Sequence, residues 1–218
     1  MLQFPCLVLD HDDTTVDSTR TVNYPQFLEA IAYFRPGFTM TLDEYITHCF
    51  NSGFYEMCEK TLHYTPEEMK AHMDMWKEYH KTHHPAFFPG IPELIARQKA
   101  EGGYVCVVSH SSKDVILGAY DHHSVPEPDL VFGAELPPDQ RKPNPWPLEE
   151  IMRTLQLQSK DLLMVDDMPH GSIMSRTAGV SFACAGWCGT LPAIEAHMRR
   201  ISDYYFSTVE SFAHFQFF

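Results

Sequence analysis

The sequence lacks the features that mark membrane, secreted and nucleic-acid-binding proteins. No stretch of its 218 residues approaches the roughly 18 apolar residues that a membrane-spanning helix needs. Its six cysteines form no CxxC pair, and the chain does not start with the basic residues of a signal peptide. Positive charge is scarce, since 16 Lys and Arg stand against 29 Asp and Glu, a net charge of −13. We therefore expect a reduced, cytoplasmic monomer or homodimer that binds neither membranes nor nucleic acid.

Short apolar runs alternate with helix-like segments along most of the chain. The runs are rich in Val and are bounded by turn residues, which is typical of buried strands. They occupy residues 6–9, 104–108, 130–132, 162–165 and 180–183, with 204–206 as a candidate edge strand. The predicted helices are 92–100, 113–120, 147–155, 171–178 and 191–199. This alternation predicts an α/β fold, a doubly wound, Rossmann-like parallel sheet covered on both faces.

Residues 18–85 interrupt this alternation. They contain no convincing strand, and helix-like stretches occur at 24–33, 42–50 and 66–80. Thr65, followed by Pro66 and two glutamates, is a typical helix start. A segment of this length exceeds an ordinary strand-to-helix connection. We therefore predict a helical domain at 18–85, inserted into an α/β core domain made of residues 1–17 and 86–218.

Acidic residues follow two of the predicted strands. In open α/β sheets, ligands bind beyond the carboxyl ends of the strands. Asp10 and Asp12 follow the first strand at i and i+2, so they can face the same side of an extended chain. Such a pair suits Mg²⁺ or acid/base chemistry, although DxD alone also fits a solvated turn. Asp166 and Asp167 follow a later strand and offer hard oxygen ligands, although the doublet alone could cap the next helix.

Two other loops supply hydroxyl groups and a positive charge. Ser109, His110, Ser111 and Ser112 follow the second predicted strand and could cradle an anion, although Ser109 alone fits a helix cap. Lys142 lies in a proline-rich loop that could hold it in a fixed place. With the two Asp pairs, these residues supply a nucleophile, an acid/base, phosphate-binding groups and metal ligands. The combination predicts phosphoryl transfer through an aspartyl phosphate.

These motifs resemble those of haloacid dehalogenase (HAD) superfamily phosphatases. The matching segments are LVLDHDDT at 7–14, VVS at 107–109, KPNP at 142–145 and LMVDD at 163–167, with FPGIPEL at 88–94 and AGV at 178–180. The helical insertion resembles a C1-type cap domain. The subgroup looks like the phosphoglycolate phosphatases and β-phosphoglucomutases.

The resemblance implies a role for each motif residue. Asp10 would be the nucleophile, Asp12 the general acid and base, and Lys142 a catalytic residue that orients Asp10. Ser109, His110 and Lys142 would bind the substrate phosphate, although a lone loop His is more often structural. The implied cofactor is Mg²⁺, with metal ligands Asp10, Asp12 through its backbone carbonyl, Asp167, and Asp166 as a neighbouring or water-mediated ligand.

Several positions depart from the family pattern. Asp13 stands where Gly is common, Thr15 where Leu is usual, and His170 where many relatives carry a carboxylate. A second cluster, made of His80, His83 and His84, has no Cys or acidic partner at a spacing suited to zinc, and we do not expect a zinc site there.

The sequence thus favours a Mg²⁺-dependent phosphatase acting on a small phosphorylated metabolite, with phosphoglycolate-like compounds as candidate substrates. Asp12 supports this interpretation, because the resemblance implies that relatives acting on other bonds lack an acid at this position. A sugar-phosphate mutase like β-phosphoglucomutase is the first alternative. A non-catalytic phospho-ligand-binding or signalling module is the second.

Overall fold

A computed structural model describes residues 2–218 of the chain. The chain divides into two compact units, one formed by the residues up to Asp17 together with Ala86–Phe218, the other by Ser18–Pro85. Within the first unit, the segment that ends at Asp17 and the segment that begins at Ala86 run side by side. The Asp17 N–H donates to the Ala86 carbonyl at 2.9 Å, and the Phe88 N–H donates to the Thr15 carbonyl at 3.0 Å. Among the described residues, no helix combines the length and apolar character that crossing a membrane requires.

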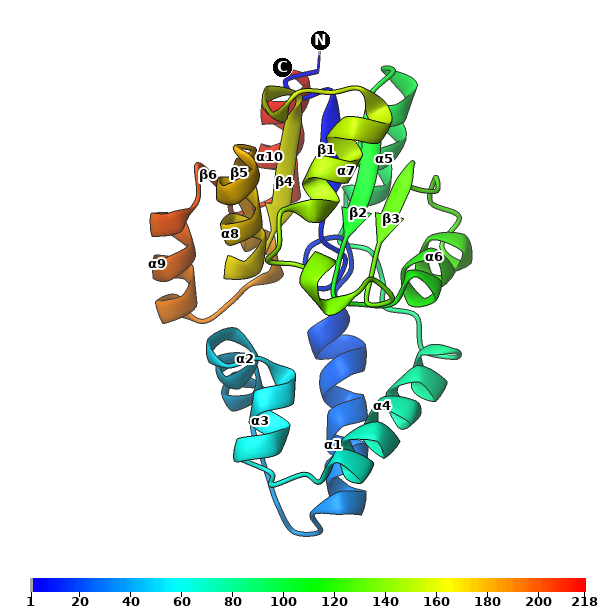
Figure 1. Cartoon of the computed structure of the whole chain (residues 1–218), viewed down its shortest axis with the longest axis vertical. Coiled ribbons are helices and arrows are strands. Elements are labelled where there is room, and N and C mark those ends of the chain that lie inside the picture. The colour runs from blue at the N-terminus through cyan, green and yellow to red at the C-terminus, as the bar shows by residue number, and fades with distance from the viewer. Residues whose placement is uncertain (1) are drawn as a thin grey trace. The chain divides into compact units, whose positions relative to one another are not determined.

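The first unit contains a six-stranded, fully parallel sheet (Figure 1). The strand order is β3-β2-β1-β4-β5-β6. The strands are β1 (Cys6–Leu9), β2 (Tyr104–Val108), β3 (Leu130–Phe132), β4 (Leu162–Asp166), β5 (Ser181–Ala185) and β6 (Tyr204–Phe206). The central strands β1 and β4 are buried along their whole length, whereas the edge strands β3 and β6 are half-buried. The predicted doubly wound α/β fold is confirmed.

The two faces of the sheet are covered by different helices. Alternate strand residues share one face of the sheet. One face packs in a common core with α5 (Ile91–Ala100), α6 (Lys113–His122) and α10 (Val209–Phe217). The strand residues on this face are Leu7, Leu9, Val105, Val107, Leu163, Val165, Ala183 and Ala185. Their neighbours in sequence, such as Val8 and Met164, are equally buried on the other face. Figure 1 shows α7 (Trp146–Leu155) and α8 (Pro169–Ala178) in front of the sheet and α5 and α10 behind it.

Apart from the last, the helices of this unit begin and end close to the predicted positions. They are α5 (Ile91–Ala100), α6 (Lys113–His122), α7 (Trp146–Leu155), α8 (Pro169–Ala178), α9 (Pro192–Ile201) and α10 (Val209–Phe217). The sequence did not predict α10, because its aromatic residues are not typical of a helix. Thr208 begins this helix by accepting the Ser211 N–H at 3.1 Å. Strand β5 also continues two residues beyond its predicted end, where Cys184 and Ala185 pair with β6.

The second unit is helical and has its own core. After a π-helical turn at Thr19–Asn23, its helices are α1 (Tyr24–Phe34), α2 (Leu42–Asn51), α3 (Phe54–Lys60) and α4 (Pro66–His80). Thr41 and Thr65 each form a capping box with a glutamate three residues later, which begins α2 and α4 where the sequence predicts. The short α3 was not predicted, because seven residues carry little periodicity. The core consists of Phe27, Ile31, Met40, Tyr45, Met57, Cys58, Leu62 and Tyr64.

A buried histidine makes the stability of the helical unit sensitive to acid. His72 lies between Tyr64 Oη at 3.3 Å and Gln26 Oε1 at 3.2 Å, contacts that suit a neutral ring with its proton on Nε2. Burial lowers the pKa of His72 from 6.5 to about 4. The unfolded chain therefore takes up a proton below pH 6.5 that the folded unit excludes. We expect the free energy of unfolding to fall by up to about 3 kcal/mol as pH drops from neutral to 4.

Urea unfolding at pH 7 and pH 5 tests this expectation. His72→Gln keeps a polar side chain but cannot titrate, so its stability should depend less on pH than that of the wild type. An identical pH dependence in the two proteins would show that His72 is not the source.

Candidate active site

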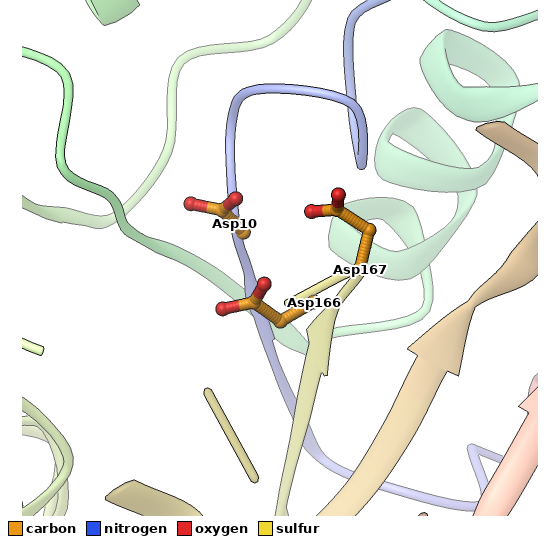
Figure 2. Close-up of side chains that lie close together, drawn as sticks. All are labelled: Asp10, Asp166 and Asp167. Atoms are coloured by element: carbon orange, nitrogen blue, oxygen red, sulfur yellow. The ribbon is translucent and has the colours of Figure 1, made fainter. Parts of the chain in front are cut away.

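The candidate site lies at the carboxyl ends of β1 and β4. These strands are paired with Leu9 opposite Val165, so the next residues, Asp10 and Asp166, face each other at the same edge of the sheet. The Asp10 N–H donates to the Val165 carbonyl at 2.8 Å, which fixes the backbone at this point. Asp10, Asp166 and Asp167 each place a carboxylate oxygen within 4.8 Å of the others (Figure 2).

Lys142 joins two of these carboxylates. Its Nζ lies 2.8 Å from Asp10 Oδ1 and 2.8 Å from Asp166 Oδ2, and its side chain is only 2% exposed. Asp166 is fully buried, and its other oxygen accepts the Met168 N–H at 2.8 Å. Both oxygens of Asp166 are therefore engaged by the protein.

The charges of this cluster are not balanced by Lys142 alone. Burial raises the pKa of Asp10 to about 6; Lys142 opposes this shift, whereas Asp166 and Asp12 add to it. Burial and the charges of Asp166, Asp13 and Asp10 raise the pKa of Asp167 as well. Burial would lower the pKa of Lys142, but the charges of Asp10 and Asp166 outweigh it and raise the value. The site thus holds an excess of carboxylate charge that a further cation would relieve.

The donor set fits a hard divalent cation. Carboxylate oxygens are the ligands that Mg²⁺ prefers, and it commonly uses one or two of them. Asp10 has one oxygen on Lys142, and within residues 2–218 the side chain of Asp167 accepts only a long contact of 3.4 Å from Thr14 Oγ1. Asp10 and Asp167 are therefore the best placed of the cluster to hold a metal. The structure does not bring the Asp12 carboxylate into the cluster. Asp12 was expected to bind the metal through its backbone carbonyl and not through this carboxylate.

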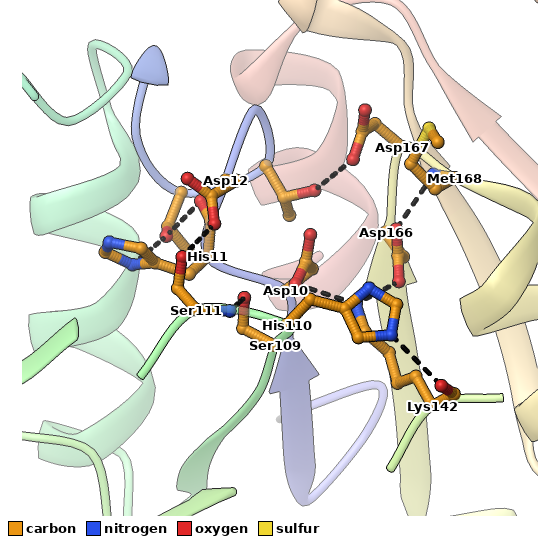
Figure 3. Close-up of polar contacts among 12 residues, drawn as sticks. Asp10, His11, Asp12, Ser109, His110, Ser111, Lys142, Asp166, Asp167 and Met168 are labelled. Atoms are coloured by element: carbon orange, nitrogen blue, oxygen red, sulfur yellow. Dashed lines mark hydrogen bonds and ion pairs between the residues drawn. The ribbon is translucent and has the colours of Figure 1, made fainter. Parts of the chain in front are cut away.

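The loop after β2 brings hydroxyl groups to the same edge. Ser109 is buried, and its Oγ accepts the Ser111 N–H at 3.2 Å. Ser111 Oγ in turn donates to Asp12 Oδ2 at 2.6 Å (Figure 3). The hydroxyl of Ser111 and the carboxylate of Asp12 are thus in direct contact, although 99 positions separate them in the sequence.

His110 is exposed and hydrogen-bonds to the loop that carries Lys142. Its Nε2 lies 3.0 Å from the Lys142 carbonyl oxygen, so this nitrogen carries the proton (Figure 3). The ring also lies edge to face with His170, at a centroid distance of 5.3 Å. One ring nitrogen of His110 is therefore engaged by the protein rather than presented to a ligand.

The loop after β1 has its own supports. Asp13 adopts a left-handed conformation with φ of 54°, a backbone geometry that glycine adopts more easily than other residues. The Trp187 indole N–H donates to the Thr14 carbonyl at 2.9 Å. Thr15 is fully buried, and its hydroxyl donates to the His11 carbonyl at 2.9 Å. Hydrogen bonds from Trp187 and Thr15 therefore hold this loop in place.

A glycine in α8 makes room for Asp166. A Cβ added at Gly171 would lie 2.5 Å from Asp166 Oδ2 and 2.6 Å from Asp166 Cβ. We expect Gly171→Ala to displace the Asp166 carboxylate from Lys142 and to lower the unfolding free energy by about 1–3 kcal/mol. Chemical denaturation measures this. Thr177→Ala, an exposed substitution in the same helix, is the matched control and should change stability by at most about 0.5 kcal/mol. A Gly171→Ala protein as stable as the control would contradict the close approach.

The structure gathers the residues that the sequence singled out and adds others. It places Asp10, Asp166, Asp167 and Lys142 in one cluster, with Ser109, His110 and Asp12 on the adjoining loops. Neither the contact between Ser111 and Asp12 nor the support of the first loop by Trp187 was predicted from the sequence. Within residues 2–218, the histidines at 80, 83 and 84 form no group with metal-ligating geometry; the His83 ring stacks on Tyr79 at 3.8 Å.

A parallel α/β sheet with three aspartates and a buried lysine at its carboxyl edge defines an acidic, hydrolase-like site. The family model for haloacid dehalogenase-like hydrolases matches residues 7–185, most of the chain. The chain belongs to this family.

Individual relatives are distant in sequence. Pyrophosphatase PpaX of Halalkalibacterium halodurans is 23% identical over 125 residues, 56% of this chain, and the match spans 58% of that relative's length. A predicted phosphoglycolate phosphatase from Haemophilus somnus shares the fold at a TM-score of 0.76 and 17% identity, covering 99% of both chains. A proposed β-phosphoglucomutase from Bacteroides vulgatus does so at 0.72 and 20% identity, covering 98% of this chain and 87% of that one. The expected resemblance to this family is confirmed, and structures named for both expected subgroups are among those that share the fold.

Proposed function

We propose that the protein is a Mg²⁺-dependent phosphatase that cleaves small phosphomonoesters through an aspartyl phosphate on Asp10. The observation that carries the proposal is the buried Lys142, which bridges Asp10 and Asp166 beside Asp167. Phosphoryl transfer depends mostly on positioning and charge neutralisation, and this cluster is arranged for both. The names of the relatives, a pyrophosphatase and a phosphoglycolate phosphatase, agree with this activity.

The proposed reaction has two steps. A carboxylate oxygen of Asp10 attacks phosphorus, the bond from phosphorus to the ester oxygen breaks, and Asp12 gives its proton to the leaving oxygen. Asp12 then takes a proton from water as that water attacks phosphorus, and the bond between phosphorus and the Asp10 oxygen breaks. Inorganic phosphate leaves, and both carboxyl groups return to their starting state. Ser109 and Lys142 would hold phosphoryl oxygens, and Lys142 would also keep Asp10 oriented.

The metal would be held by Asp10, by Asp167 and by the backbone carbonyl of Asp12, with Asp166 in an outer position. When bound, Mg²⁺ would offset the charge of the carboxylates and of the phosphoryl oxygens. His110 would line the phosphate-binding loop, with Nε2 already directed to the Lys142 carbonyl.

The substrate class in this proposal is a small phosphorylated metabolite, with phosphoglycolate-like compounds as the first candidates. The helical unit at 18–85 would act as the cap domain that selects among them. A sugar-phosphate mutase is the second candidate, because a proposed β-phosphoglucomutase shares the fold. A mutase would interconvert isomers and require a bisphosphate primer, whereas a phosphatase releases phosphate at a steady rate.

Phosphate release from a panel of phosphomonoesters, with added Mg²⁺ and with EDTA, tests the proposal. We expect turnover that EDTA abolishes and that excess Mg²⁺ restores. Isomer exchange without phosphate release would favour the mutase. No reaction with any ester would favour a binding module and would overturn the proposed activity.

A further inference from the structure

Ser111 makes a short hydrogen bond to Asp12. Its hydroxyl oxygen lies 2.6 Å from Asp12 Oδ2, within the range for a hydroxyl that donates to a carboxylate (Figure 3). Ser111 is only 6% exposed, so water competes little for this contact. A buried, charge-assisted bond of this kind restricts the carboxylate that it holds.

The backbone of Ser111 is itself fixed on both sides. Its N–H donates to Ser109 Oγ at 3.2 Å, and its carbonyl accepts the Ala134 N–H at 2.9 Å. Gly133 approaches closely as well, since a Cβ at that position would lie 2.6 Å from the Ser111 carbonyl oxygen. These contacts fix the backbone from which the Ser111 hydroxyl projects. The loop after β2 thereby connects the proposed phosphate-binding Ser109 to Asp12.

We propose that Ser111 is a positioning residue for Asp12, holding the plane of its carboxylate in the orientation needed for proton transfer. This inference rests on the proposed function, in which Asp12 protonates the leaving oxygen. Asp12 lies on a loop, and the fixed hydroxyl of Ser111 restricts the rotation of its side chain. The hydroxyl acts through Asp12 and does not itself touch the reacting atoms.

If Ser111 positions Asp12, the loss of activity on removing its hydroxyl depends on how basic the leaving group is. Phenoxide is a strong base and needs a proton as its bond to phosphorus breaks, whereas dinitrophenoxide is a weak base and can leave without one. The ratio kcat/KM reports only the steps up to formation of the aspartyl phosphate, so the later role of Asp12 as a base does not enter it. Both esters are aryl phosphates and place the same phosphoryl group in the site.

The test compares kcat/KM for phenyl phosphate and dinitrophenyl phosphate in wild type, Ser111→Ala and Asp12→Asn, with Mg²⁺ present. General acid catalysis raises the reaction rate by about 10²–10⁴-fold, and a misplaced acid loses part of this rate increase. We expect Ser111→Ala to lose roughly 10- to 100-fold on phenyl phosphate and less than about 3-fold on dinitrophenyl phosphate. Asp12→Asn should show the same pattern with a larger loss.

Two further variants separate positioning from structure. Ser159→Ala removes a serine hydroxyl just before β4, at the edge of the sheet opposite the site, and should leave both esters unaffected. Ser111→Thr keeps the hydroxyl and should restore much of the turnover of phenyl phosphate. Melting temperatures establish that each variant is folded.

The outcomes distinguish this inference from the proposed function. Equal losses on the two esters, or no loss on either, in the folded Ser111→Ala variant would overturn the role of Ser111 alone. If Asp12→Asn loses no more on phenyl phosphate than on dinitrophenyl phosphate, Asp12 is not the general acid. If the wild type turns over neither ester, the proposed activity fails, and the role of Ser111 fails with it.

Discussion

Asp10→Asn is expected to abolish phosphate release while leaving the protein folded. The amide cannot form the bond to phosphorus that the proposed first step requires, and losing a nucleophile lowers kcat by at least about 10³-fold in enzymes of this type. The fold should tolerate the change, because burial already raises the pKa of Asp10 to about 6. Burial therefore makes the charged carboxylate less stable in the fold than in the unfolded chain, and replacing it by a neutral amide offsets part of the lost contact with Lys142.

Acid quenching followed by mass spectrometry tests the same prediction by locating the phosphoryl group on the chain. During turnover, the wild-type peptide that contains Asp10 should gain a phosphoryl group, and the Asp10→Asn peptide should not. Asp139→Asn, an exposed substitution of the same kind, is the matched control and should keep full activity. An Asp10→Asn protein that still releases phosphate at the wild-type rate would exclude Asp10 as the nucleophile.

The close approach of Asp10 and Asp166 is the part of the site that the sequence predicts best. Each follows a short apolar run, and parallel strands bring their carboxyl ends to one edge of the sheet. That argument needs only strand positions, which hydrophobic runs and turn residues define well. Lys142 was identified from the sequence as a source of positive charge. Its contact with both carboxylates could not be predicted, because it depends on the path of a loop.

Contacts between loops could not be predicted in this way. The bond from Ser111 to Asp12 and that from Trp187 to Thr14 join residues 99 and 173 positions apart, and no periodicity or spacing encodes them. Helix α10 was missed for a different reason, because burial of its aromatic side chains outweighs their weak helix propensity. The neutral state of His72 likewise follows from packing inside the helical unit and not from its neighbours in sequence.

Lys142→Met is expected to impair both activity and stability. The substitution leaves the carboxylates of Asp10 and Asp166 buried without their shared cation. Breaking a buried ion pair by removing one partner costs about 3–5 kcal/mol. Turnover should fall by about 10³-fold, because the group that orients Asp10 and neutralises phosphoryl charge is gone. Lys60→Met is the control, since Lys60 forms an exposed pair with Glu56 that contributes at most about 1 kcal/mol.

The stability loss in Lys142→Met should shrink as pH falls. Asp10 has a raised pKa in the fold, so the folded state takes up a proton more readily than the unfolded chain, and acid relieves the uncompensated charge. In metal-free buffer, the difference from wild type should be largest at pH 8 and smaller at pH 5. The loss should also be smaller in an Asp10→Asn background, where one of the two carboxylates is absent. A loss that is independent of pH and unchanged by Asp10→Asn would mean that Lys142 stabilises the fold by packing and not by its charge.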